Sequence, residues 1–151
     1  MRLATTFLVT VVGALLACGG SKDPNAVLDD TKSAAIEITP GATADDMVSS
    51  SDDEVDWKRF NVGERSPATV NIYWDNPDIK AKVALRDTFG ATAGELEHAA
   101  GAPKDTISVP ALADGTYFIE VRALKGSSVY TVEVILGNPD EGGSYGVPRP
   151  E

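Results

Sequence analysis

The amino-acid sequence predicts an all-β fold, an antiparallel β-sandwich of jelly-roll type with seven to eight short strands. From residue 34 to residue 136, most runs alternate apolar and polar side chains with a period of two, which is typical of strands with one buried face. Helical periodicity is nearly absent, and Gly, Pro and Asp residues interrupt the runs at short intervals. About 100 residues suffice for one core of this kind.

Six alternating runs predict individual strands. They are residues 36–39, 70–74, 79–86, 107–109, 117–122 and 130–136. Asp114 and Gly115 supply a turn before the fifth run, and Gly126 and Ser127 separate it from the sixth. Residues 90–102 contain scattered alanines among acidic side chains, so we expect a surface loop there.

The first 17 residues have the pattern of an export signal. Arg2 precedes an apolar run at residues 7–17, which is shorter than the roughly 20 apolar residues of a membrane-spanning helix. Residues 15–18, with two leucines, an alanine and Cys18, resemble the lipobox of bacterial lipoproteins. The resemblance implies removal of residues 1–17 and lipidation of Cys18. The alternative is an ordinary secretory signal that leaves a free thiol.

The regions that flank the predicted sandwich lack apolar periodicity. Residues 18–33 begin with the lipidated cysteine and continue as a polar, flexible tether that spans on the order of 20 Å. Residues 138–151 are rich in Gly and Pro and predict a disordered tail. The β-sandwich domain therefore occupies residues 34–137.

The charge of the chain restricts its partners. The net charge is -10, and removal of residues 1–17, which carry Arg2 and no acidic residue, makes it -11. Nucleic acid and anionic lipid headgroups repel such a chain, so we expect membrane contact through the lipid on Cys18 alone. Gly19 follows Cys18, where an aspartate signals inner-membrane retention in well-studied Gram-negative cells, and this favours the outer membrane.

Two separated motifs resemble the bacterial pre-peptidase C-terminal domain, which is related to the collagen-binding domain of clostridial collagenases. The motifs are residues 53–63 (DEVDWKRFNVG) and 113–122 (ADGTYFIEVR), each followed by an alternating run. The resemblance implies a β-sandwich that assists rather than catalyses, and some such domains bind collagen or carbohydrate. Lys58 departs from the pattern, because the family usually has an aromatic side chain there. Either its stem snorkels past the edge of the core, or the strand has another register.

Acidic residues before the first motif are candidate calcium ligands. Calcium takes six to eight oxygen ligands, and carboxylates as dense as Asp52, Asp53 and Asp56 repel one another without a cation. The resemblance also implies a calcium site near this point. The simpler interpretation, which we favour, is a solvated acidic loop. No cofactor is required by either interpretation.

Neighbouring aromatic residues are candidates for ligand binding. Tyr73 and Trp74 are adjacent on a predicted strand, so one of them faces outward, where its ring can stack on a sugar or a peptide. The simpler interpretation, which we favour, is that a neighbouring loop covers the outward ring.

An enzyme is disfavoured. Cys18 is committed to lipid, His98 is the sole histidine, and no serine motif is present. We therefore expect a non-catalytic module, lipid-anchored outside the cytoplasm in the cell envelope, that binds carbohydrate, peptide or a matrix ligand. The alternative is a structural or accessory subunit of a cell-envelope protein assembly.

Overall fold

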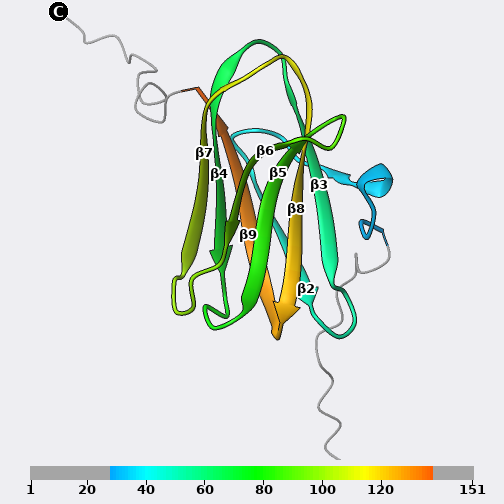
Figure 1. The fold of residues 1–151 in the computed structure, drawn as a ribbon, viewed down its shortest axis with the longest axis vertical. Coiled ribbons are helices and arrows are strands. Elements are labelled where there is room, and N and C mark those ends of the chain that lie inside the picture. Colours follow the sequence, from blue (N-terminus) through cyan, green and yellow to red (C-terminus); the bar gives the residue numbers. More distant parts are fainter. Residues whose placement is uncertain (1–27, 138–151) are drawn as a thin grey trace, which may run out of the picture.

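A computed structural model describes residues 28–137 and consists of two β-sheets packed face to face (Figure 1). The five-stranded sheet has the order β1-β3-β8-β5-β6, and the four-stranded sheet has the order β2-β9-β4-β7. Neighbouring strands are antiparallel, except that β1 is parallel to β3. The elements are η1 (Lys32–Ala34), β1 (Ile36–Glu37), β2 (Thr43–Ser49), β3 (Val55–Val62), β4 (Ser66–Trp74), β5 (Lys80–Asp87), β6 (Thr92–Glu97), β7 (Lys104–Leu112), β8 (Gly115–Lys125) and β9 (Ser127–Leu136). The predicted all-β sandwich is confirmed, with nine strands within residues 28–137.

The core lies between the two sheets and is made by the inward residues of the alternating runs. On β4, Val70, Ile72 and Trp74 are buried and Tyr73 is exposed. On β5, Val83 and Leu85 are fully buried. Because successive side chains of a strand point to opposite faces, the period of two in the sequence becomes one buried and one outer layer on each sheet.

A single glycine carries the chain from one sheet to the other after β8. Gly126 separates β8 in the five-stranded sheet from β9 in the four-stranded sheet and has a φ of 85°. Glycine adopts this conformation without the steric cost that a Cβ would add. The predicted break at Gly126 is therefore correct.

Three strands lie outside the six predicted runs: β3 contains the first family motif, and β2 and β6 were not expected from the sequence. β6 lies within residues 90–102, where we predicted a loop; it is an edge strand with no fully buried side chain, so its sequence carries no apolar alternation. β2 is hidden because its inward position between Ala44 and Val48 is Asp46, a buried carboxylate. His98, which follows β6, is also buried rather than part of a polar surface loop.

The folded domain begins before residue 34. Asp29 lies within the predicted tether, but its side chain is 1% exposed, and its backbone oxygen accepts a hydrogen bond from the Trp57 N–H at 2.9 Å. The predicted signal peptide at residues 1–17, the predicted lipidation site Cys18 and the predicted tail at residues 138–151 lie outside the described residues. Within residues 28–137, no helix has the length and apolar character needed to cross a membrane.

Candidate functional site

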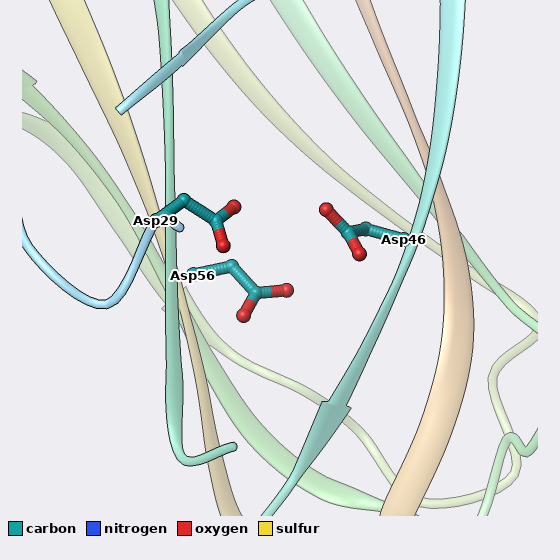
Figure 2. A group of neighbouring side chains, drawn as sticks. All are labelled: Asp29, Asp46 and Asp56. Carbon is teal, nitrogen blue, oxygen red and sulfur yellow. The ribbon is translucent and has the colours of Figure 1, made fainter. Parts of the chain in front are cut away.

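Three carboxyl groups and one amine meet inside the sandwich, and we call them the buried acidic cluster. Its members are Asp29, Asp46, Asp56 and Lys58. One oxygen from each carboxyl group lies within 4.8 Å of the others, and Figure 2 shows the three groups pointing toward a common space. Each of the four residues is buried, with exposure of 7% or less.

The strand positions of the four cluster residues explain why their side chains meet. Asp56 and Lys58 are two apart on β3, so both point inward, and their backbones pair with β8 on one side. Asp46 is an inward position of β2 in the opposite sheet. Asp29 belongs to the segment that pairs with Trp57 beside β3. The cluster thus joins the two sheets and the N-terminal segment.

Lys58 is the cation of the cluster. Its Nζ donates hydrogen bonds to Oδ2 of Asp29 and to Oδ2 of Asp46. Burial by itself would lower the pKa of Lys58, but the bonds to these two carboxylates outweigh it and raise the pKa above its ordinary value. Lys58 therefore does not snorkel to the surface, and it lies on the inward face of β3 with Phe60 and Val62, as expected. A buried lysine is tolerated because it is paired.

Asp56 has a different charge state from its neighbours. Burial raises its pKa to about 8, although the hydrogen bond from Tyr130 and the nearby Lys58 act in the opposite direction. Tyr130 Oη donates to Asp56 Oδ2 at 2.7 Å, and burial and the charge of Asp56 raise the pKa of this phenol well above its ordinary value. At neutral pH, Asp56 is therefore mostly a neutral carboxylic acid beside the two carboxyl groups that bind Lys58.

The predicted calcium ligands do not form one group. Asp52 is exposed and accepts a hydrogen bond from Ser51, whereas Asp53 and Asp56 are 2% and 0% exposed, so the solvated loop that we favoured is wrong for these two. Asp29 and Asp46, which join Asp56, were not among the three predicted ligands. The carboxylates of this cluster are of the kind that hold a cation, but two of them already bind the Lys58 ammonium. Calcium binding by this chain stays a prediction.

The two candidate aromatic residues have separate roles. Trp74 is 4% exposed, and its Nε1 donates to Asp105 Oδ2 at 2.8 Å, so it is a core residue and cannot offer a stacking surface. His98 Nδ1 lies 2.7 Å from the same oxygen and its Nε2 lies 2.9 Å from the backbone oxygen of Pro77. This network ties β4, β7 and the end of β6 together. Tyr73 alone is at the surface, with 38% exposure.

Tyr73 lies at the centre of a polar outer face of the four-stranded sheet, which we call the platform. The platform residues are Asp45 on β2, Asn71 and Tyr73 on β4, Lys104 on β7, and Thr131 and Glu133 on β9. Lys104, Tyr73, Thr131 and Asp45 form one row across the four strands.

Hydrogen bonds hold the platform side chains in place. Glu133 Oε2 accepts from Asn71 Nδ2 at 3.0 Å and from Tyr73 Oη at 3.3 Å. Thr131 Oγ1 donates to Asp45 Oδ1 at 2.6 Å, and Lys104 Nζ lies 5.0 Å from the centre of the Tyr73 ring. The Tyr73 ring is therefore held among polar side chains on the outer face of the sheet.

Comparison with known proteins supports the resemblance found in the two motifs. Residues 54–123 match the family model of the bacterial pre-peptidase C-terminal domain. No curated protein sequence matches the chain. Among solved structures, the pre-peptidase C-terminal domain of a collagenase from Bacillus anthracis aligns with a TM-score of 0.58 and 17% identity, over 66% of this chain and 93% of that domain. This similarity shows that the two share a fold.

Two other solved structures align more weakly. A periplasmic inhibitor of g-type lysozyme from Aeromonas hydrophila has a TM-score of 0.39 and 13% identity, over 68% of this chain and 98% of that one. A β-glucosidase from Paenibacillus barengoltzii has a TM-score of 0.29 and 11% identity, over 65% of this chain and 11% of that one.

Pre-peptidase C-terminal domains are non-catalytic β-sandwich modules that are often part of extracellular proteins.

Proposed function

We propose that this chain is a non-catalytic binding module of the cell envelope, anchored to the outer membrane through a lipid on Cys18, and that its platform binds carbohydrate. The observation that carries the proposal is the row of Lys104, Tyr73, Thr131 and Asp45 across the outer face of the four-stranded sheet. An aromatic ring surrounded by hydrogen-bonding groups suits a sugar, which has apolar ring faces and a polar rim.

The extent of the platform across four strands favours an extended ligand. The residues come from four adjacent strands, with a spacing of about 4.8 Å between strands, so the row is long enough to contact more than one sugar unit. A polymeric glycan would gain from repeated weak contacts. Peptide and matrix ligands are the other members of the expected class, and the experiment below separates them.

The anchor gives the platform its location. The lipobox-like residues 15–18 support lipidation of Cys18, and several acyl chains hold a protein firmly, at about 0.8 kcal/mol for each buried methylene group. Replacement of Cys18 by serine should move the protein from the membrane fraction to the soluble fraction. The mass of the Cys18 peptide from membranes tests the same point directly.

The ligand class is tested with one variant and one matched control. The full protein should be retained by insoluble glycans, including cell-wall sacculi, and by glycan arrays. Tyr73→Ala should lower retention about two- to tenfold, since one stacked ring contributes roughly 0.5 to 1.5 kcal/mol. Phe89→Ala removes a different exposed aromatic ring and should leave retention unchanged. Equal retention of wild type and Tyr73→Ala, or binding to peptide arrays alone, would overturn carbohydrate binding at the platform.

A specific surface feature favours the second candidate function, an accessory subunit of an envelope assembly. Phe89 lies between β5 and β6 and is 95% exposed. Its backbone is held rigidly, because Asp87 Oδ1 accepts the N–H groups of Phe89 and Ala91, both at 2.8 Å. A fully exposed aromatic side chain on a rigid turn is a suitable anchor for a protein partner. Loss of a defined set of co-purified envelope proteins in Phe89→Ala, but not in Tyr73→Ala, would support this function.

A further inference from the structure

The buried acidic cluster brings a primary amine into contact with carboxyl groups, and this juxtaposition permits a covalent step. We propose that Lys58 and Asp29 become joined by an intramolecular amide bond between Nζ and the side-chain carbon Cγ. The hydrogen-bonded pair of the structure is the state that precedes the reaction.

The reaction needs no component from outside the protein. Transfer of one proton from Lys58 Nζ to Asp29 converts the ion pair into a neutral amine and a carboxylic acid, and a neutral amine is a nucleophile. Nζ then attacks Cγ and the C–N bond forms. The C–O bond to the hydroxyl group breaks, and one water molecule leaves. The ammonium and the carboxylate supply all the atoms of the amide and the water.

Contact and burial favour the step. Lys58 is 1% exposed and Asp29 is 1% exposed, and the fold holds their reacting groups in hydrogen-bonding contact. Well-oriented groups within one molecule react as though at effective concentrations of roughly 10⁵ M or more. The surrounding core also excludes the water that would reverse the reaction. The ion pair is the resting state, so the bond forms slowly after folding.

Asp56 and Asp46 complete the transfer of protons. Asp46 accepts a hydrogen bond from Nζ and is placed to take the second proton of the amine. Asp56 Oδ2 accepts the Tyr130 hydroxyl, and Oδ1 is buried with no hydrogen-bond partner in the part of the chain that the structure describes, so Oδ1 can carry a proton to the leaving hydroxyl group. Burial raises the pKa of Asp56 to about 8, which keeps that proton in place at neutral pH. Return of a proton from Asp46 to Asp56 restores both groups.

The surroundings of the two candidate carboxyl groups select Asp29 as the electrophile. Asp46 Oδ1 accepts the backbone N–H of Met47 at 3.0 Å, and a donor of this kind stabilises the ionised form. Within residues 28–137, Asp29 Oδ1 is buried with no hydrogen-bond partner. Asp29 therefore lacks the backbone donor that holds Asp46, and we assign it as the electrophile.

The bond would fasten the segment that leads toward Cys18. Asp29 precedes all the strands of the sandwich, so an amide to Lys58 covalently closes the N-terminal segment onto β3. Only this consequence rests on the proposed anchoring. The chemistry is independent of the lipid and of any ligand, and its test does not depend on either.

Tryptic mapping of the full protein, purified after prolonged incubation and denatured, tests the bond. An amide at Lys58 blocks cleavage after that residue. The expected product is the peptide of residues 23–32 joined to the peptide of residues 33–59. Its mass equals the sum of the two peptide masses minus one water molecule. Separate, unmodified peptides 23–32 and 33–58 would overturn the proposal. A loop closed within residues 33–59, with peptide 23–32 free, would overturn Asp29 as the partner.

Variants distinguish the bond from the ion pair alone. Lys58→Arg keeps a cation whose guanidinium is not a nucleophile under these conditions, and it should show no loss of water. Asp56→Asn should slow the appearance of the joined peptide at least tenfold while leaving both reacting groups present. An unchanged rate in Asp56→Asn would remove Asp56 from the mechanism. If Lys58→Arg does not fold, the wild-type peptide map still decides whether the bond exists.

Discussion

The sandwich contains two charge networks, each with one central charged group between two groups of opposite charge, and the two networks differ in their exposure to water. In the buried acidic cluster, one cation, Lys58, lies between the carboxylates of Asp29 and Asp46. On the outer face of the five-stranded sheet, one carboxylate, Glu120, lies between two guanidinium groups, with Arg86 Nε at 2.7 Å and Arg122 NH2 at 3.0 Å. The side chains of these arginines are 26% and 36% exposed, whereas that of Lys58 is 2% exposed.

This difference decides what each network contributes. Water can solvate the partly exposed arginines if Glu120 is lost, so each pair on that face adds little to stability. Asp29 and Asp46 have no such replacement for Lys58, because ionised groups in an apolar interior are costly without a partner. Ion pairs between the same types of side chain therefore contribute little to stability on the outer face, whereas loss of one partner in the core is strongly destabilising.

Removal of Lys58, the central cation of the buried acidic cluster, should lower stability more than any change in the outer network. Lys58→Met leaves two buried carboxylates without their cation, and we expect the free energy of unfolding to fall by about 3 to 5 kcal/mol. Arg122→Met is the matched control on the outer face and should cost about 1 kcal/mol or less. Urea unfolding of both variants at neutral pH measures the two values. Equal losses would mean that burial does not govern these networks.

The dependence of stability on pH should have opposite signs in the two networks. The folded-state pKa of Asp56 is about 8, above its ordinary 3.8, so between these values the folded protein holds a proton that the unfolded chain has lost. The stability that this proton contributes is complete below about pH 4 and is lost as the pH rises through about 8. Asp56→Asn, which stays neutral, should flatten this decline by a few kcal/mol, as measured by urea unfolding from pH 4 to pH 9.

Glu120 provides the control of opposite sign. Burial alone would raise its pKa, but the hydrogen bonds from Arg86 and Arg122 outweigh that effect and hold the pKa below its ordinary value. Its contribution is present above the ordinary pKa and is lost as the pH falls through the folded-state pKa. Glu120→Gln should therefore weaken the loss of stability in acid only. If Glu120→Gln changed the dependence of stability on pH above neutrality, the assignment of the alkaline decline to Asp56 and of the acid decline to Glu120 would be wrong.

Calcium should have the smallest effect. Lys58 already neutralises the carboxylates that a calcium ion would need, and calcium would have to displace that ammonium without the six to eight oxygens it prefers. We expect the thermal unfolding midpoint to be the same in millimolar calcium and in a chelator. A midpoint that rises with calcium but not with magnesium would restore Asp52, Asp53 and Asp56 as candidate ligands.

The fold was largely predictable because most strands have one apolar face. The alternation of Val70, Ile72 and Trp74 with Asn71 and Tyr73 reports the burial of β4 directly. The same rule fails for β2, since the inward position of Asp46 is polar and the run no longer alternates. The rule also fails for β6, because this edge strand has no buried side chain and its sequence therefore shows no apolar alternation.

The candidate sites were only partly predictable. Adjacent aromatic residues indicated that one of Tyr73 and Trp74 faces outward, but the pattern could not say which side of the strand was the core. Asp56 was named for calcium because it is close in sequence to Asp52 and Asp53. Its actual partners, Asp29 and Asp46, are distant along the chain and have no shared motif. The unexpected Lys58 in the family pattern was the signal that a buried counter-charge should be sought.

The sequence by itself determined the β-sandwich class of the fold and predicted an export signal, because strand periodicity, family motifs and signal patterns are local and are read from neighbouring residues. These patterns led to the β-sandwich and to the expected anchor at Cys18. The tertiary structure alone decided the charges of the core. Asp29, Asp46, Asp56 and Lys58 come from three separate segments, and whether a carboxylate there is solvated, paired or protonated depends on distances that arise only when both sheets close around it.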